Sequence, residues 1–112
     1  MSINSILTVK IDSHGGYKFI VAELTDGNGG KCLVVRADQG CDYHRDILRG
    51  LRLEVRPLGL EARCIGGGQI SINPETKKIS IRGSSGDFGV EPDRNETVRM
   101  LQEAYPEYQV TR

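Results

Sequence analysis

Apolar and polar residues alternate over several short stretches of this chain, a pattern typical of β-strands in a half-buried sheet. Strands are predicted at residues 9–11, 17–24, 31–36 and 61–65, at a hairpin formed by residues 70–73 and 79–81, and at residues 108–111. Three consecutive glycines, Gly66, Gly67 and Gly68, separate the fourth strand from the hairpin. We expect this glycine triplet to bend the chain, although it could also form a bulge or admit a ligand.

Two other segments repeat apolar residues at helical spacing. The first contains Ile47, Leu48, Leu51 and Val55, with Asp42 as the expected N-cap and Pro57 as the stop. The second contains Val98, Leu101 and Tyr105, preceded by a capping box of Asp93 and Glu96 and ended by Pro106. The elements together predict an α/β fold, with a mixed sheet of about six strands flanked by two main helices.

Length and composition are consistent with one domain spanning residues 1–112. The formal net charge is zero and Trp is absent, so the chain offers no global electrostatic case for binding nucleic acid or an acidic membrane. The three cysteines form no CxxC pair, and no apolar signal core follows Met1. We therefore expect a reduced, cytoplasmic protein, and a monomer.

His44 lies where the first helix should begin. Backbone N–H groups are unpaired there and the helix dipole is positive, so an anion can bind beside the imidazole. The same field disfavours the imidazolium ion, and a neutral ring could act as a base or a nucleophile toward phosphate. The alternative, preferred on this stretch alone, is an exposed residue at a helix start.

Three cations could converge on His44: Lys18 in the first long strand, Arg36 at the end of a strand, and Arg45 directly after the histidine. Such a set could clamp a phosphoryl group. Lysine and arginine more often lie on a solvated sheet face, so both interpretations stay open.

The glycine-rich loop at residues 83–89 is a second candidate for anion binding. Its small residues could direct several backbone N–H groups into one concavity, and Ser84 and Ser85 could add hydroxyl donors. The loop matches no nucleotide-binding motif, and on its sequence alone a simple turn is preferred.

A zinc site built from Cys32, Cys41, Cys64 and His44 is a further hypothesis. The spacings lack the close ligand pairs of zinc modules, so small, buried, apolar cysteines are the simpler interpretation.

Four motifs in order carry a resemblance that covers nearly the whole chain. They are Asp12-Ser13-His14-Gly15-Gly16-Tyr17-Lys18-Phe19, Tyr43-His44-Arg45-Asp46-Ile47, Cys64-Ile65-Gly66-Gly67-Gly68-Gln69-Ile70 and Tyr105-Pro106-Glu107-Tyr108-Gln109-Val110-Thr111. In these motifs the chain resembles the phosphohistidine phosphatase family, also called Janus/Ocnus.

The resemblance implies a protein phosphatase that hydrolyses the P–N bond of phosphohistidine without a metal or other cofactor. Its substrates would be phosphohistidine-containing proteins or small phosphoramidates. His44 matches the family's catalytic histidine, and Lys18 and Arg36 match substrate-binding residues. Ser85, Gly86 and Asp87 match the loop that holds the phosphoryl group.

Two positions depart from the family pattern. Gln69 stands where an arginine is common, and Asp87 stands where a small neutral residue is usual. Both changes make the pocket less positive. They motivate an alternative function, a non-catalytic regulatory module that binds phosphorylated or acidic partners.

Overall fold

The computed structural model describes residues 6–112. In chain order its elements are β1 (Val9–Lys10), β2 (Gly15–Thr25), β3 (Lys31–Ala37), α1 (His44–Val55), the 3-10 turn η2 (Arg56–Leu58), β4 (Glu61–Asn73), β5 (Lys78–Arg82), α2 (Arg94–Ala104) and β6 (Gln109–Thr111). None of the helices among these residues is both long and apolar enough to cross a membrane.

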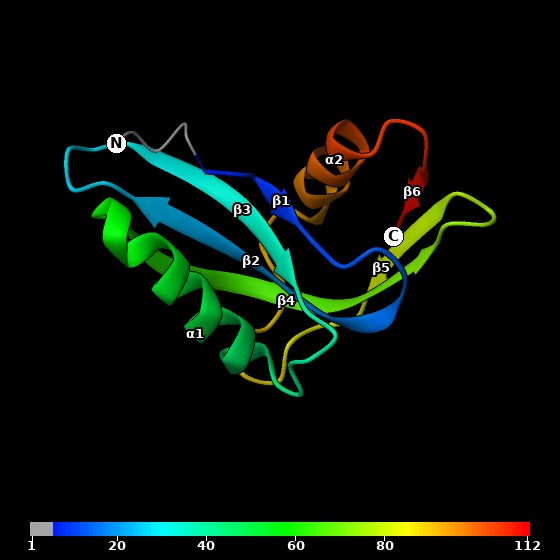
Figure 1. The fold of residues 1–112 in the computed structure, drawn as a ribbon, viewed down its shortest axis with the longest axis horizontal. Coiled ribbons are helices and arrows are strands. Elements are labelled where there is room, and N and C mark those ends of the chain that lie inside the picture. Colours follow the sequence, from blue (N-terminus) through cyan, green and yellow to red (C-terminus); the bar gives the residue numbers. More distant parts are fainter. Residues whose placement is uncertain (1–5) are drawn as a thin grey trace.

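The six strands form one mixed sheet in the order β1-β3-β2-β4-β5-β6 (Figure 1). The central strands β3, β2, β4 and β5 pair antiparallel, whereas β1 and β6 add parallel strands at the two edges. The predicted fold class, a mixed sheet of about six strands with two main helices, is therefore confirmed.

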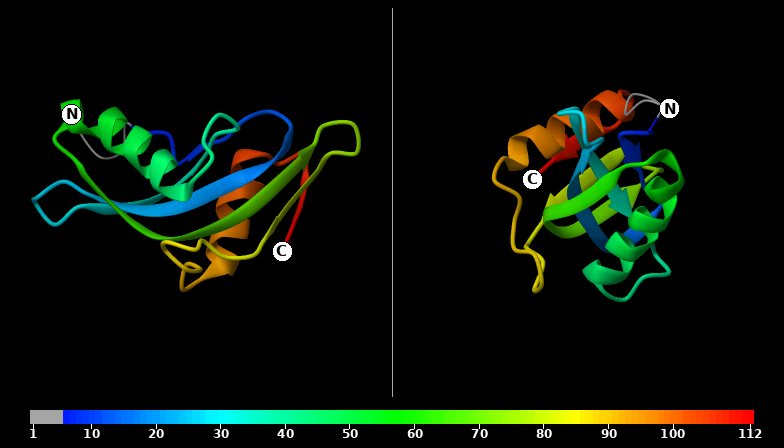
Figure 2. Two further views of the ribbon diagram at one scale, coloured as in Figure 1. Left: turned by 90° about the horizontal axis from the view of Figure 1, so that it is seen from below. Right: turned by 90° about the vertical axis from the view of Figure 1, so that its left-hand side faces the viewer.

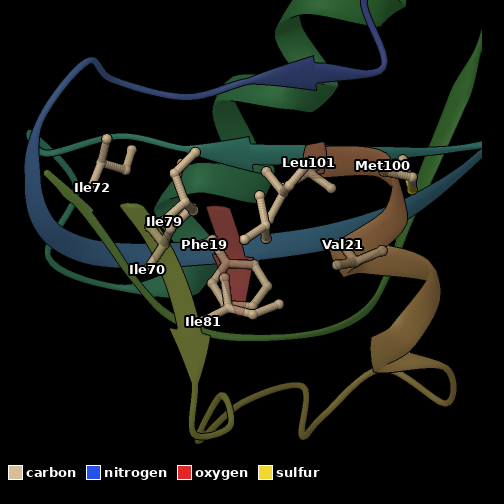
Figure 3. Packing of buried hydrophobic residues seen from close by; sticks show 11 residues of the cluster. Phe19, Val21, Ile70, Ile72, Ile79, Ile81, Met100 and Leu101 are labelled. Atoms are coloured by element: carbon tan, nitrogen blue, oxygen red, sulfur yellow. The ribbon is translucent and has the colours of Figure 1, made fainter. Parts of the chain in front are cut away.

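The two helices cover opposite faces of this curved sheet (Figure 2). Alternate residues of β2 divide between the faces, as the strand period of two requires. Phe19 and Val21 join Met100 and Leu101 of α2 in one core cluster (Figure 3). Ile20, Ala22 and Leu24 instead pack against α1 through Ile47, Leu48, Leu51 and Val55. We call the face of the sheet that carries Ile20 the α1 face.

The glycine triplet does not interrupt the sheet, and of the alternatives left open for it the structure shows the bulge. β4 runs without interruption through Gly66, Gly67 and Gly68, and the pairing with β2 shifts register between Val21 and Ala22. Val21 is opposite Gly66 while Ala22 is opposite Cys64, which leaves one extra residue in β4. This is a β-bulge, and it increases the local twist of the strand.

The helix boundaries follow the predicted caps in one case and not in the other. Asp93 is the N-cap of α2 and accepts a hydrogen bond from the Glu96 backbone N–H at 3.2 Å, as the capping box predicted. Asp42 does not cap α1. The extended residue before that helix is Tyr43, whose side chain makes no capping hydrogen bond.

A buried ion pair at the start of α2 supports the glycine triplet from the other face of the sheet. Arg94 donates to the Glu91 carboxylate at 2.8 and 3.2 Å, to the Gly67 carbonyl at 2.9 Å and to the Gly83 carbonyl at 2.7 Å. Thr97 donates to the same carboxylate at 2.6 Å. One guanidinium thereby joins α2, β4 and the 83–89 loop.

We predict that this pair makes stability depend on acid pH. Burial opposes the charge on Glu91, but hydrogen bonds from Arg94 and Thr97 outweigh it and lower the pKa of this carboxyl below its ordinary value of 4.5. The stabilisation is therefore present above pH 4.5 and is lost as the pH falls through the lowered pKa. Glu91→Gln should lower the free energy of unfolding at pH 7 by about 3 kcal/mol and reduce its loss in acid.

The matched control is Glu96→Gln. Glu96 pairs with Arg99 at the same i,i+3 spacing, but the pair is exposed, so little change is expected. Denaturant unfolding of both variants between pH 3 and 7 gives the comparison. Equal effects of the two substitutions would contradict the role given to the buried pair.

Candidate functional site

Helix α1 begins above the glycine triplet and runs away from the β4–β5 hairpin. Its first residue, His44, contacts the Gly68 carbonyl, whereas Arg52 near its end donates to the Ala62 carbonyl at 3.4 Å. The N-terminus of α1 therefore points along β4 (Figure 1), toward the part of the strand that contains the exposed residues Gln69 and Ser71. The prediction that His44 lies in the first turn of a helix is confirmed.

The first turn of α1 retains free backbone donors. No side chain caps it, and the Asp46 N–H bonds back to the Tyr43 carbonyl at 3.0 Å. Within residues 6–112, the N–H groups of His44 and Arg45 have no acceptor. These donors and the positive end of the helix dipole favour an anion at this place.

The His44 side chain is buried, with 5% of its surface exposed, so the interpretation as an exposed helix-start residue is wrong. Its Nε2 lies 2.9 Å from the Gly68 carbonyl oxygen. A carbonyl oxygen only accepts, so Nε2 must carry the proton, which leaves the lone pair of the neutral ring on Nδ1. A Cβ at position 67 would collide with the Phe19 carbonyl oxygen and would crowd His44 Cδ2 at 3.2 Å, so the backbone requires glycine beneath the ring.

A row of polar side chains crosses the sheet next to this histidine. Beneath the ring, Ile20 of β2 is paired with Gly67 of β4. Two residues further along β4, Gln69 is paired with Lys18 of β2 on one side and with Arg82 of β5 on the other. Consecutive rows on one face are about 7 Å apart. We call Lys18, Gln69 and Arg82 the cation row.

The cation row lines a cavity of about 290 Å³ on the α1 face, near the lower limit of small-molecule sites. Ser71 and Ser80 form the next row and add two hydroxyl groups to its wall. His44 is not among the lining residues, so the ring lies beside the cavity under the start of α1. The structure thus brings the predicted residues Lys18 and Gln69 together near His44.

The 83–89 loop is pinned to the same part of β4, because the Gly67 N–H donates to the Gly89 carbonyl at 3.1 Å. Ser85 is buried, and its amide also donates to Gly89 O, at 2.9 Å. Its Oγ accepts from the amides of Asp87 and Phe88 at 3.2 and 3.1 Å. The amides of Ser85, Asp87, Phe88 and Gly89 are thus used within the loop, and the donors without an acceptor among the described residues include the Gly86 N–H and the hydroxyls of Ser84 and Ser85.

Arg45, which follows His44 in α1, forms an ion pair with Asp87 of the 83–89 loop. The Arg45 guanidinium lies 4.0 Å from Asp87 Oδ2 and stacks 4.4 Å above the Tyr43 ring. Both charged side chains are substantially exposed, so the pair adds little stability. The Arg45 charge nevertheless offsets that of Asp87, the carboxylate expected to repel phosphate.

The structure does not bring Arg36 to the cavity. Its guanidinium is buried and donates twice to the Glu54 carboxylate, at 3.2 and 3.0 Å, and to the carbonyls of Val35 and Leu7. Glu54 lies near the far end of α1, about 15 Å along the axis from His44. Burial opposes the charge of Glu54, but Arg36 outweighs it and lowers the pKa of that carboxyl. Arg36 therefore connects β3 to α1 and has a structural position in the fold.

The zinc hypothesis finds no support among residues 6–112, where no three His, Cys, Asp or Glu side chains gather as a metal site would require. The three cysteines, Cys32, Cys41 and Cys64, are free thiols. They are partly buried and pack against the core between β2 and α1.

Two arginines that shape this region, Arg82 in the cavity and the buried Arg94, were not identified from the sequence. Arg82 alternates with the buried residues Ile79 and Ile81, so the hairpin register could have placed it opposite Gln69. Arg94 gives no comparable signal, because an arginine in the first turn of an amphipathic helix is ordinarily exposed.

These features define a small α/β protein with a buried helix-start histidine beside a cationic cavity. The family model of the Janus/Ocnus family matches residues 3–109, and the chain belongs to that family.

Several relatives have names of their own. The chain is 36% identical over 102 residues to "Sex-regulated protein janus-A" of Drosophila yakuba, and 35% identical over 102 residues to that of Drosophila melanogaster, covering 91% of this chain and 75% of each relative. It is 29% identical over 109 residues to the "14 kDa phosphohistidine phosphatase" of Sus scrofa, covering 92% of this chain and 86% of that protein. The likeness therefore spans the whole fold and includes one protein named as an enzyme.

The contact with Gly68 predicts the tautomer of His44. Long-range proton–nitrogen NMR at a pH where the ring is neutral should show hydrogen on Nε2 and a bare Nδ1, because Nε2 faces an oxygen that only accepts. His14 lies exposed in a turn and is the internal reference. A His44 ring protonated on Nδ1 would contradict the geometry described.

The contacts of Arg36 predict a structural effect. Arg36→Met should lower the free energy of unfolding by about 2 kcal/mol, because it leaves Glu54 and two backbone carbonyls without their donor. Under conditions where the variant stays folded, its affinity for phosphate should match that of the parent. Calorimetric titration with phosphate provides the check, and a lost affinity with unchanged stability would instead make Arg36 a ligand-binding residue.

Proposed function

We propose that this protein is a phosphohistidine phosphatase, a hydrolase that breaks the P–N bond of phosphohistidine in proteins or of small phosphoramidates. The observation that carries the proposal is the buried His44 ring, held through Nε2 beside a cationic cavity. The name of the pig relative gives the reaction class.

The Nδ1 lone pair of His44 would do the chemistry. In one route it accepts a proton from water as the water oxygen bonds to phosphorus and the P–N bond breaks, while the substrate imidazole, already protonated on its other nitrogen, leaves as neutral imidazole. In the other route Nδ1 itself bonds to phosphorus as the P–N bond of the substrate breaks and its imidazole, already protonated on the other nitrogen, leaves; water then hydrolyses the P–N bond of that phosphoenzyme. Both routes use the same tautomer, so the proposal covers either one.

The remaining groups would neutralise charge on the phosphoryl oxygens, which is the main task of catalysis in phosphoryl transfer. Lys18 offers an ammonium group from the cation row, and the free amides at the start of α1 offer backbone donors. Gln69, the Ser85 hydroxyl and the Gly86 amide would add neutral donors, while Arg45 offsets the charge of Asp87. Leaving-group protonation and these cations explain why no metal is needed in the proposed reaction.

A second candidate function is phosphate binding without turnover. The neutral Gln69 in the middle of the cation row and the internally bonded amides of the 83–89 loop favour it over fast catalysis. Such a module would bind a phosphohistidine peptide and leave its P–N bond intact.

Phosphate release from a phosphohistidine peptide in excess chelator tests the proposal. The parent protein should release phosphate, and His44→Ala should reduce the rate at least about 100-fold, because it removes the base or nucleophile. His14→Ala removes the other, exposed histidine and should leave the rate unchanged. Binding without release by the parent would favour the regulatory module, and an unaffected His44→Ala variant would refute the role of that residue.

A further inference from the structure

Arg82 is a cation that the proposed reaction does not yet use. It is the last residue of β5 and its side chain is exposed. Ile79 and Ile81 of the same strand are buried in the core cluster that includes Met100 and Leu101 of α2. Because side chains of a strand alternate between the two faces, Arg82 lies on the α1 face, where it lines the cavity with Lys18 and Gln69. It therefore shares the cavity in which the phosphoryl group would bind.

The charge of Arg82 is not compensated by the protein. Among residues 6–112, neither Arg82 nor Lys18 forms an ion pair, whereas eight other cation–carboxylate contacts are present. No acidic residue in this described part of the chain lines the cavity. Two unpaired cations facing one cavity repel each other unless an anion binds between them.

The position of Arg82 is also fixed more firmly than its exposure suggests. Its backbone carbonyl packs so closely on Gly68 that a Cβ at that position would collide with it. The next residue, Gly83, is held by the buried Arg94. The backbone of Arg82 is therefore anchored to the residue whose carbonyl orients His44.

We propose that Arg82 is a substrate-binding residue that contacts the phosphoryl group from the opposite side to Lys18, an inference that rests on the proposed function. Strands are about 4.8 Å apart, so the Cα atoms of Lys18 and Arg82 lie about 10 Å apart with Gln69 between them. Both side chains are long enough to reach one anion across that gap. The guanidinium supplies the paired donors that Gln69 lacks.

The other ligand that an exposed arginine could bind is a carboxylate next to phosphohistidine in a protein substrate. The shared row with Lys18 and the anchoring to Gly68 favour the phosphoryl group. The experiment separates the two by using one substrate that has no carboxylate.

Steady-state kinetics should be measured with phosphoramidate and with a phosphohistidine peptide that has acidic neighbours. Arg82→Gln should lower kcat/KM at least about tenfold for both substrates, because it removes a charge-assisted contact to a group they share. Arg82→Lys should retain part of the activity. Arg63→Gln, at the other end of β4 and outside the cavity, is the matched control and should behave as the parent.

The double variant Gln69→Arg, Arg82→Gln should regain much of the lost kcat/KM, because it returns a guanidinium to the same row one strand away. A parent protein without turnover would refute the proposed function itself. An active parent with an unaffected Arg82→Gln variant would overturn only the inference about Arg82. A loss confined to the acidic peptide would overturn it in favour of carboxylate recognition.

Discussion

The arrangement of this protein depends on the close packing of backbone at three consecutive glycines of β4. Gly66 packs against the backbone of Glu91, Gly67 against the Phe19 carbonyl and the His44 ring, and Gly68 against the Arg82 carbonyl. Any Cβ here would push these segments apart. The close approach lets the Gly68 carbonyl reach His44 Nε2, and lets Arg94 reach the Gly67 carbonyl from the other face. One short run of backbone thus orients the histidine and anchors the loop beside it.

The second organising feature is the length of α1 relative to the face that it covers. The helix buries the rows of β2 from Ile20 to Leu24 and begins where the glycine triplet ends, so the rows of Lys18 and Gly16 remain open. The free N–H groups of the helix start point over this open part, whose described lining residues carry cations and hydroxyl groups but no carboxylate. A dianionic phosphoryl group has the charge and the acceptors that such a surface lacks. The position of α1 on the sheet therefore has two consequences. It buries the apolar rows of β2, and it leaves the start of the helix free to bind an anion.

The sequence predicted those parts of the fold and site that local patterns encode. Alternation identified the strands, and spacing identified both helices and the position of His44 at a helix start. The bulge at Gly66 was not predictable, because glycine permits a bend and a bulge equally and the pairing with β2 decides between them. Arg36 shows a similar limit: a cation before a helix suggests phosphate binding, but Glu54, 18 residues further on, pairs with it. Arg82 could have been placed opposite Gln69 from the local hairpin register, but Lys18 joins the same row only through the long-range pairing of β2 with β4, which a strand's own residues do not reveal.

The most direct test of the central claim, that His44 acts on a phosphoryl group bound at this face, is a phosphorus NMR time course of the protein with phosphoramidate in excess chelator. One spectrum series reports binding, any phosphoenzyme and turnover together. We expect a shifted phosphoramidate signal that is replaced by orthophosphate much faster than in buffer, with any covalent intermediate located on His44. A phosphoramidate signal that decays only at its spontaneous rate would contradict it.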